Sequence, residues 1–319
     1  MKNAGFLIVL LLFFSACKED NQIEKEISKI VVDVNIERFD LAFGTAQPGD
    51  LPKLKAEYPF LFSERIPDSV WVERMKDTLQ NELVAEVKST FSNFNNEQQA
   101  IESLFQHLKY YDTSFKVSRV ITVTSDVDYR NKTIVTDTIV LISLDTYLGS
   151  DHHFYEGIQK FLTQNMKRSQ IVSDLAANYA EQYIFQEDPK TLLDDMVYFG
   201  KQLYFKDKMI PFTSDADKIG YTEEQLAWAA ENESEIWRYF IERELLFSTD
   251  NSLASRFIAD APFSKFYLEL DSESPGRLGQ YMGWQIVRAY MNTNDVPLME
   301  MLQKNADEIF NKSKFKPRK

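Results

Sequence analysis

Three polar side chains with the spacing of a shared helical face lie in residues 169–186, SQIVSDLAANYAEQYIFQ. Asp174, Asn178 and Glu181 occupy positions i, i+4 and i+7, so on a helix they form one column. Zinc peptidases present two histidine ligands with the same i, i+4 geometry. The column is therefore a set of candidate cleft residues. The simpler alternative is a solvated or hydrogen-bonded stripe on a core helix.

Two of the three histidines form a second candidate cluster, in the segment from Asp151 to Glu156. If a helix begins there, His153 and Glu156 share a face, which is the minimum for two zinc ligands. Alternatively, Asp151 caps the helix and both histidines lie at the surface. No third ligand follows from spacing, and the chain contains no HExxH, GxSxG, P-loop or Rossmann glycine motif. We therefore predict no catalytic residue, no bound metal and no cofactor.

The single cysteine, Cys17, has a different chemical use. It follows a basic start, an apolar run over residues 6–14 and the small pair Ser15-Ala16. This order of segments is typical of a secretory signal peptide, and the apolar run is too short to span a bilayer. A cysteine directly after the small pair resembles a bacterial lipobox, in which the thiol is acylated and becomes the first residue of the mature chain. We expect residues 1–16 to be removed and Cys17 to hold the protein on a lipid bilayer. An uncleaved anchor, or an ordinary signal peptide with a chance cysteine, is the alternative.

Composition bounds the remaining possibilities. The chain has 319 residues, 44% of them hydrophobic, which is enough for a sizeable core. Its net charge of −13 argues against a nucleic-acid partner, because phosphate binding requires a basic face. One cysteine excludes an intrachain disulfide and a thiolate zinc site. We predict a polar tether over residues 17–28, a single globular domain over 29–311 and a basic tail over 312–319.

The candidate column lies on a helix that the sequence places at the centre of the fold. Its apolar residues recur at helical spacing over more than half of the circumference, so other elements should pack around it. These residues are Ile171, Val172, Leu175, Ala176, Tyr179, Ala180, Tyr183 and Ile184.

The rest of the pattern predicts a mostly helical α+β fold with a small antiparallel or mixed sheet packed on the central helix. A strand is expected within residues 29–39, and two β-branched runs, 117–127 and 134–144, read as a hairpin joined by a turn at 130–132. Helices are expected at 67–91, 96–111, 223–247, from Pro275-Gly276 onward, and at 297–310.

Several long motifs occur in a characteristic order over residues 30–310. They are NIERFD, YPFLF, RVITVTSDVDYRNKTIVTDTIVLISLDTYLG, DHHFYEG, SQIVSDLAANYAE, LLDDMVYFGKQLYF and LGQYMGWQIVRAYM. Together they resemble the GldB family of gliding-motility lipoproteins, and the signal peptide with Cys17 agrees. The resemblance implies a place in the envelope of Bacteroidetes, in or beside the machinery that moves surface adhesins. It does not imply catalysis.

A second resemblance connects the chain to a group of predicted zinc-dependent proteases. The segment 279–287, GQYMGWQIV, fits their C-terminal GxxxGxxIV motif. Where that group carries HExxH, this chain has Asp174, Leu175 and Asn178, and Phe199 precedes Gly200 where the third ligand would lie. None of these residues supplies the ligands and general base of a zinc peptidase. The resemblance therefore implies a zincin-like scaffold that has lost its site.

We expect a non-enzymatic lipoprotein of the gliding machinery, held in the cell envelope by acylated Cys17. Its location would be the periplasmic face of the outer membrane or the cell surface, and its partners other gliding or secretion proteins of the envelope. One alternative is an envelope hydrolase with an unrecognised carboxylate site. Another is a module that binds a glycan or peptide in the cleft of the lost zinc site. Paired carboxylates would favour the first alternative and exposed aromatic side chains the second.

Overall fold

The computed structural model describes residues 22–185, 190–269 and 271–318. The expected signal peptide, Cys17 and the first part of the expected tether lie outside the described residues. Within those residues, no helix combines the length and apolar character needed to cross a bilayer.

Four short strands form one mixed sheet: β1 (Ile36–Arg38), β2 (Arg119–Val123), β3 (Thr133–Val135) and β4 (Ile139–Ser143). Their order is β1-β2-β4-β3. β1 and β4 both lie parallel to β2, whereas β3 is antiparallel to β4. A small mixed sheet among many helices confirms the predicted α+β class.

The predicted pairing of the two β-branched runs is wrong. The first run, β2, lies parallel to β4, with Ile121 opposite Leu141, so the two runs do not form a hairpin. The second run folds back on itself through residues 136–138, and Thr136 closes this turn because its hydroxyl accepts a hydrogen bond from the Ile139 N–H at 3.0 Å. The early strand is also shorter than expected, since α2 (Phe39–Gly44) begins directly after Arg38.

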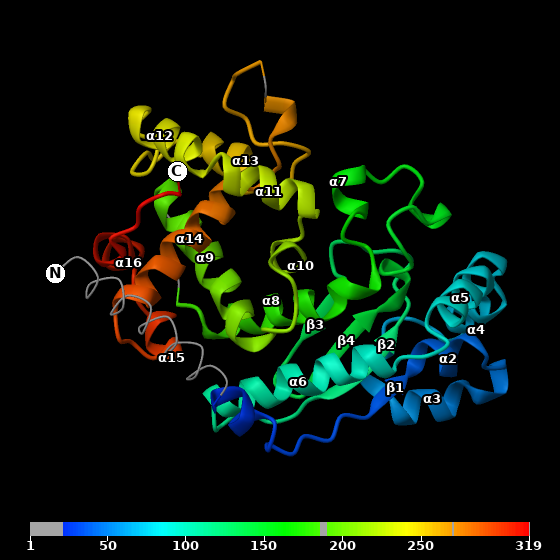
Figure 1. Ribbon diagram of the computed structural model, residues 1–319. Coiled ribbons are helices and arrows are strands. Elements are labelled where there is room, and N and C mark those ends of the chain that lie inside the picture. The colour runs from blue at the N-terminus through cyan, green and yellow to red at the C-terminus, as the bar shows by residue number, and fades with distance from the viewer. Residues whose placement is uncertain (1–21, 186–189, 270, 319) are drawn as a thin grey trace.

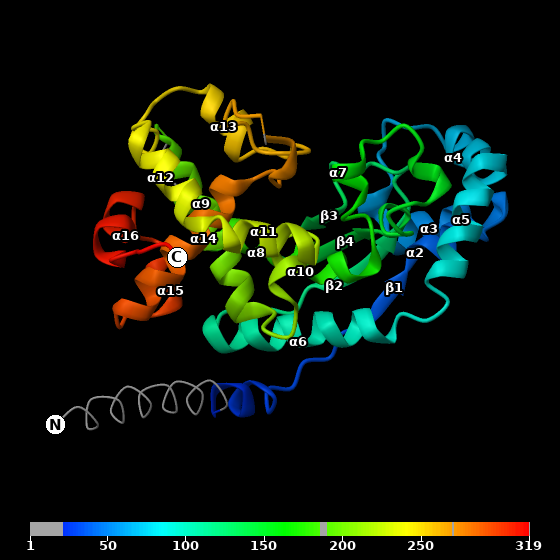
Figure 2. The ribbon, with the colours of Figure 1, turned by 45° about the horizontal axis from the view of Figure 1, so that its top comes forward.

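Helices cover both faces of the sheet (Figures 1 and 2). On one face, side chains of β2 and β4 join the main core with α6 (Asn95–Tyr111) and α8 (Ile171–Tyr183). On the other face, Ile121 packs in a smaller cluster with residues of α2, α3 (Leu51–Glu57) and α4 (Asp68–Lys76). The central helix is confirmed: all the apolar residues assigned to it are buried except Tyr183, which is partly buried.

Three expected helices are each divided in two. Residues 67–91 form α4 and α5 (Thr78–Thr90), because the Asp77 carboxylate accepts a hydrogen bond from the Gln80 N–H at 2.9 Å and so caps a new helix. Residues 223–247 form α11 (Glu223–Glu231) and α12 (Glu233–Glu242), divided at Asn232. Residues 297–310 form α15 (Leu298–Met301) and the start of α16 (Ala306–Ser313).

Two long helices, α9 (Leu192–Met209) and α14 (Leu278–Thr293), cross at two glycines. A β-carbon built on Gly283 would lie 1.7 Å from the Met196 carbonyl oxygen. One built on Gly200 would lie 2.4 Å from the Gly283 carbonyl. The backbones therefore touch where any side chain would collide, so the crossing requires glycine at both positions.

Three further helices are short: α7 (Lys160–Thr163), α10 (Asp215–Ile219) and α13 (Ser252–Phe257), of which α13 packs against α9 and α14. Both expected terminal extensions dock on the body where they are described. Residues 22–27 are helical, Ile27 is buried, and the Gln106 side chain donates to the Ile30 carbonyl at 2.8 Å. In the basic tail, the Phe315 ring meets Trp237 at 5.1 Å between centroids.

Candidate functional site

A cleft of about 660 Å³ opens beside the candidate face of α8. Figure 1 shows α7 and α10 on either side of the middle of the molecule, with α8 below them. Parts of the chain that are distant in sequence meet here: the β2–β3 loop, α7, α8, α9, α10 and the start of α14. The cleft is lined by Tyr129, Arg130, Lys132, Phe161, Leu162, Asn165, Met166, Gln170, Asp174, Glu181, Lys206, Lys218, Ile219, Gly220, Asp260 and Arg277.

Two of the three column residues reach this cleft. Asp174 and Glu181 line it, whereas the Asn178 side chain turns to the sheet, where its amide oxygen accepts a hydrogen bond from the Thr133 hydroxyl at 2.5 Å. Asp174 is already engaged, with Lys132 Nζ at 2.5 Å and the Tyr147 hydroxyl at 2.8 Å. The column is thus partly a structural stripe and partly a cleft wall.

Glu181 differs from Asp174 because it has no ion pair within 4 Å among the residues described. Burial raises the pKa of its carboxyl group. A carboxylate with a raised pKa in a cleft can accept a hydrogen bond from a ligand or exchange a proton.

The histidine cluster does not join the cleft. His153 lies in a single 3₁₀ turn, His153–Tyr155, and not in an α-helix. The turn is capped by His152, whose Nδ1 accepts from the Phe154 N–H at 3.3 Å, and not by Asp151 as predicted. His152 Nε2 lies 3.4 Å from Glu86. Within the described residues, no group of three or more His, Cys, Asp and Glu side chains is arranged to hold a metal ion, and this covers His153 and Glu156.

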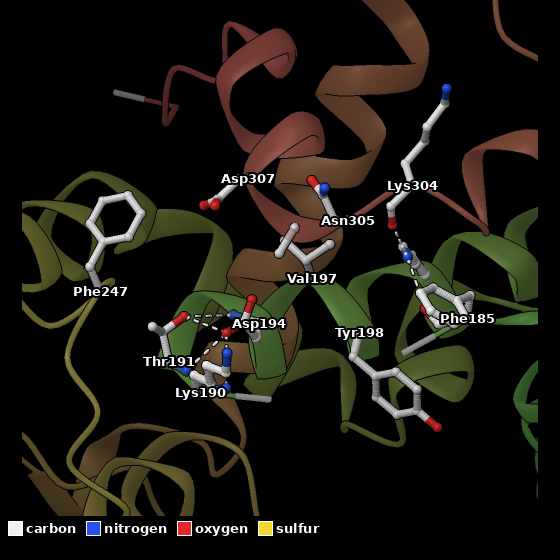
Figure 3. Close-up of a pocket in the computed structure, with 12 residues that line it drawn as sticks. Phe185, Lys190, Thr191, Asp194, Val197, Tyr198, Phe247, Lys304, Asn305 and Asp307 are labelled. Carbon is white, nitrogen blue, oxygen red and sulfur yellow. Dashed lines mark hydrogen bonds between the residues drawn. The ribbon is translucent and has the colours of Figure 1, made fainter. Parts of the chain in front are cut away.

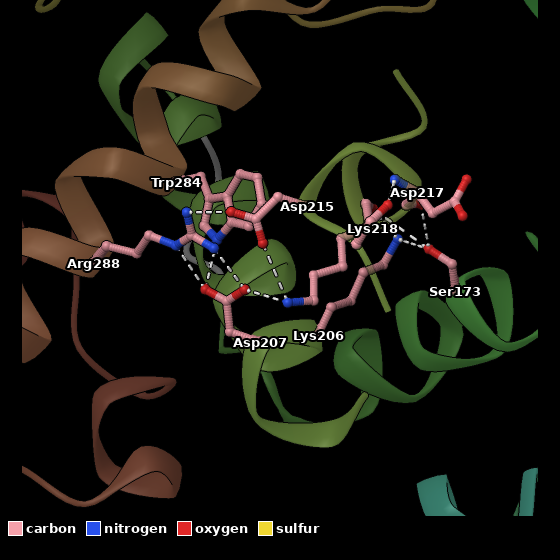
Figure 4. A network of polar contacts seen from close by, with 9 residues as sticks. Ser173, Lys206, Asp207, Asp215, Asp217, Lys218, Trp284 and Arg288 are labelled. Atoms are coloured by element: carbon pink, nitrogen blue, oxygen red, sulfur yellow. Dashed lines mark hydrogen bonds and ion pairs between the residues drawn. The ribbon is translucent and has the colours of Figure 1, made fainter. Parts of the chain in front are cut away.

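The sequence analysis missed the basic residues of the cleft. Among those that reach its floor, Lys206 on α9 is buried. Its Nζ donates to the Ser173 hydroxyl at 3.0 Å and to the Lys218 carbonyl at 2.8 Å (Figure 4). Burial lowers the pKa of Lys206 to about 8. No sequence motif predicts a buried lysine at this position, since its burial arises only from tertiary packing.

The contact between Ser173 and Lys206 has the residue types of a nucleophile and its base. It cannot act in that way, because Ser173 is fully buried on the core side of α8. The Ser173 hydroxyl also donates to the Asp217 carbonyl at 3.0 Å, so its proton is held by the protein. The pair therefore ties α8 to α9, and both members bond to backbone carbonyls of α10, so it does not form a catalytic dyad.

An ionic network holds the floor of the cleft in place (Figure 4). Asp207 accepts hydrogen bonds from Trp284 Nε1 at 2.9 Å, Arg288 Nε at 2.8 Å and Lys218 Nζ at 3.1 Å. Asp215 adds a second carboxylate near Arg288, at 2.9 Å. The network joins α9, α10 and α14, and Lys218 links it to Lys206 through its backbone carbonyl.

The β2–β3 loop at one rim has an unusual backbone. Asp126 and Val127 have φ values of 59° and 58°, a conformation that is costly for a β-branched residue such as valine. The fully buried carboxylate of Asp145 holds the loop by accepting from the Val127 N–H at 2.7 Å and the Ser125 N–H at 3.0 Å. Because the loop is fixed in this way, it presents Arg130 to the cleft.

The opposite rim is fixed by Arg277, which also has a positive φ, 57°. Its guanidinium group donates to the Gly220 carbonyl at 2.9 Å and lies over the Tyr221 ring. Asp260 lies 3.4 Å away. Strained residues therefore occur at both rims, which is common where a binding site needs a fixed shape.

A second hollow, of about 440 Å³, lies near the N-terminal end of α9 (Figure 3). Its polar groups already serve the fold. Thr191 and Asp194 form a capping box, and Lys201 Nζ donates to the Leu302 carbonyl at 3.1 Å and to the Lys304 carbonyl. It contains none of the predicted site residues, so the cleft beside α8 is the candidate site.

A family model described as "Gliding motility protein GldB" matches residues 20–317. No curated protein and no solved structure matches the chain. The similarity to zincins therefore stays a prediction.

Proposed function

The chain belongs to the GldB family of gliding motility proteins, and from this premise we propose that it is a non-enzymatic binding component of the gliding machinery, anchored by lipid on Cys17. It works at the periplasmic face of the outer membrane or at the cell surface, through contacts with other envelope proteins.

One observation supports a binding role over catalysis. The residues of α8 that the resemblance to zinc peptidases would place at the motif positions make contacts that hold the protein together. Asp174 pairs with Lys132 and Tyr147, and Asn178 pairs with Thr133. A general base directs a lone pair at substrate, whereas Oδ2 of Asp174 accepts from both Lys132 and Tyr147 and so ties this side chain to the protein.

Of the two alternative functions, the lining of the cleft supports a module that binds a glycan or peptide better than it supports a hydrolase. Its remaining carboxylate on α8, Glu181, has no nucleophile or metal ligand set beside it in the described part of the chain. A volume of about 660 Å³ is within the range of small-molecule and peptide sites.

The anchor is tested by replacing Cys17 with alanine in cells. We expect loss of palmitate labelling, release of folded protein into the soluble fraction and loss of gliding. Stable anchoring requires more than one acyl chain. Palmitate labelling that persists in Cys17→Ala would exclude this anchor.

The non-enzymatic role is tested with Asp174→Asn and Glu181→Gln, which keep size and remove charge. We expect both strains to glide with normal amounts of protein. A non-motile Asp174→Asn strain with normal amounts of folded protein would contradict the proposal and indicate an active site. A pull-down from detergent-solubilised envelopes would then identify the partner.

A further inference from the structure

The cleft beside α8 differs in charge from the rest of the chain. The whole chain carries 49 acidic and 36 basic side chains, yet the cleft is lined by five lysine or arginine residues and only three aspartate or glutamate residues. Basic residues thus gather in a cavity of a strongly acidic protein. Such a cavity attracts negatively charged ligands.

Two of these cations lack a carboxylate partner. Lys132 pairs with Asp174, Lys218 with Asp207, and Arg277 with Asp260. By contrast, neither Arg130 nor Lys206 lies within 4 Å of a carboxylate oxygen in the part of the chain that the structure describes. A buried cation that meets only neutral groups carries a desolvation cost, which a bound anion would offset.

The cleft also limits the charge of its ligand. Asp174, Glu181 and Asp260 line the same space, so a second negative charge on the ligand would be repelled. A carboxylate, with one charge, suits this balance better than a phosphate that carries nearly two.

The remaining lining residues indicate what the carboxylate is attached to. The apolar side chains of Phe161, Leu162, Met166 and Ile219 line the cleft with the cations, so an apolar group fits beside the charge. Glu181, which has no cationic partner among the described residues, can accept an N–H donor. A peptide end supplies all three features, whereas a fatty acid supplies no N–H.

We propose that the cleft binds the free C-terminal end of a protein chain, with the carboxylate near Arg130 and Lys206 and an apolar last side chain against α7. The proposal rests on the proposed function, since the ligand is part of a protein partner. Glu181 accepts a backbone N–H of the bound peptide.

The test uses the full mature chain purified from membranes in detergent, and isothermal titration with two pools of tripeptides. The pools are random at the first two positions and end in leucine or phenylalanine, either as free acids or as C-terminal amides. We expect the free acids to bind at least about tenfold more tightly than the amides, which corresponds to the loss of one charged contact. Inorganic phosphate and decanoate serve as further probes.

Variants locate the binding. Arg130→Gln should weaken the binding of the free acids about tenfold, and Lys206→Met should weaken it at least as much. Arg65→Gln is the matched control, because Arg65 is an exposed arginine that does not line the cleft. Arg130 is exposed, so its variant should fold even if the Lys206 variant does not.

Three results would overturn the assignment. They are equal binding of acids and amides, no binding of the acids, and binding of phosphate or decanoate as tight as that of the acids. None of them affects the proposed function, which depends on the anchor and on gliding of the Asp174→Asn strain. Conversely, loss of gliding in that strain with peptide binding intact would contradict only the non-enzymatic role.

Discussion

Helix α9 takes part in two regions that are built in opposite ways. At its crossing with α14, backbone meets backbone at Gly200 and Gly283, with no room for a methyl group. One and a half turns further on, Lys206 reaches the floor of a cleft of about 660 Å³ that is lined by charges. The crossing depends on shape, whereas the cleft depends on charge.

This difference indicates which kind of substitution each of the two regions should tolerate. A closely packed crossing fixes α9 relative to α14, and the Asp207 network extends this rigid base to α10. The cleft is then held open between rigid walls and can present unpaired cations. The crossing should therefore respond to added volume, and the cleft to removed charge.

The largest effect is expected from Gly283→Ala at the crossing. Overpacking a core costs about 1–3 kcal/mol when side chains can move. Here the new carbon would lie 1.7 Å from a carbonyl oxygen, so the helices must separate. We expect a loss of more than about 3 kcal/mol in the free energy of unfolding, measured by urea denaturation. Gly49→Ala is the control, because a β-carbon there meets nothing within 4 Å. Equal stability of the two variants would contradict the close crossing.

Asp145→Ala should have the next largest effect, on the cleft side. It removes the acceptor for the N–H groups of Ser125 and Val127 and leaves a strained loop without support. We expect a loss of about 2–3 kcal/mol. Hydrogen exchange should also increase at residues 124–132. Asp137→Ala, at an exposed turn, should change neither quantity. An unaltered hydrogen-exchange rate at residues 124–132 in Asp145→Ala would show that the loop keeps its conformation without the Asp145 carboxylate.

Lys206→Met tests the charge of the cleft through pH. Burial lowers the pKa of folded Lys206 to about 8, whereas an unfolded lysine titrates near 10.4. Between pH 8 and 10 the unfolded state therefore binds more protons, and stability should rise with pH by up to about 1.4 kcal/mol per unit for each such lysine.

Lys201 has the same lowered pKa, about 8, for the same reason. Lys206→Met should thus remove about half of the slope. At pH 7 the variant should be less stable than the parent, because the Lys218 carbonyl and the Ser173 hydroxyl lose their donor. Lys201→Met should also halve the slope and lower the stability, since backbone carbonyls lose their donor there too. A slope unchanged by both variants would contradict the burial of these charges.

The smallest effect is expected at Asp174. Asp174→Ala leaves the buried Tyr147 hydroxyl without its acceptor, at a cost of about 1–2 kcal/mol. Asp174→Asn keeps an acceptor and loses only the ion pair with Lys132, which we expect to cost less than about 1 kcal/mol. A larger loss for the asparagine variant would show that the charge of Asp174 holds the cleft together.

Patterns in the sequence predicted the elements whose residues are neighbours along the chain. The apolar period of residues 171–184 located the central helix, and Asp174 and Glu181 followed from the same spacing. The breaks at Asp77 and Asn232 were missed, because the apolar pattern runs through them. The boundaries are marked only by the Asp77 cap of α5 and by the Asn232 side chain, which donates to the Trp228 carbonyl at the end of α11. The turn at Thr136 was missed because it lies inside a β-branched run.

The basic residues of the cleft could not be predicted in this way. Arg130, Lys206 and Arg277 are far apart in sequence, and each looks like an ordinary charged surface residue until the fold brings them together. The parallel pairing of β2 with β4 also depends on tertiary structure, since both parallel and antiparallel neighbours suit the same β-branched run.

The docked helix at residues 22–27 limits how far the body could stand from a membrane that held Cys17 by a lipid. If Cys17 carries the lipid as proposed, four residues, 18–21, separate the anchor from a helix that Ile27 fixes on the domain. The five steps of the chain from residue 17 to residue 22 reach at most about 18 Å, less than half the thickness of a bilayer of about 40–45 Å. So short a link would keep the body beside the membrane that carries the lipid, and the cleft would meet its partner there.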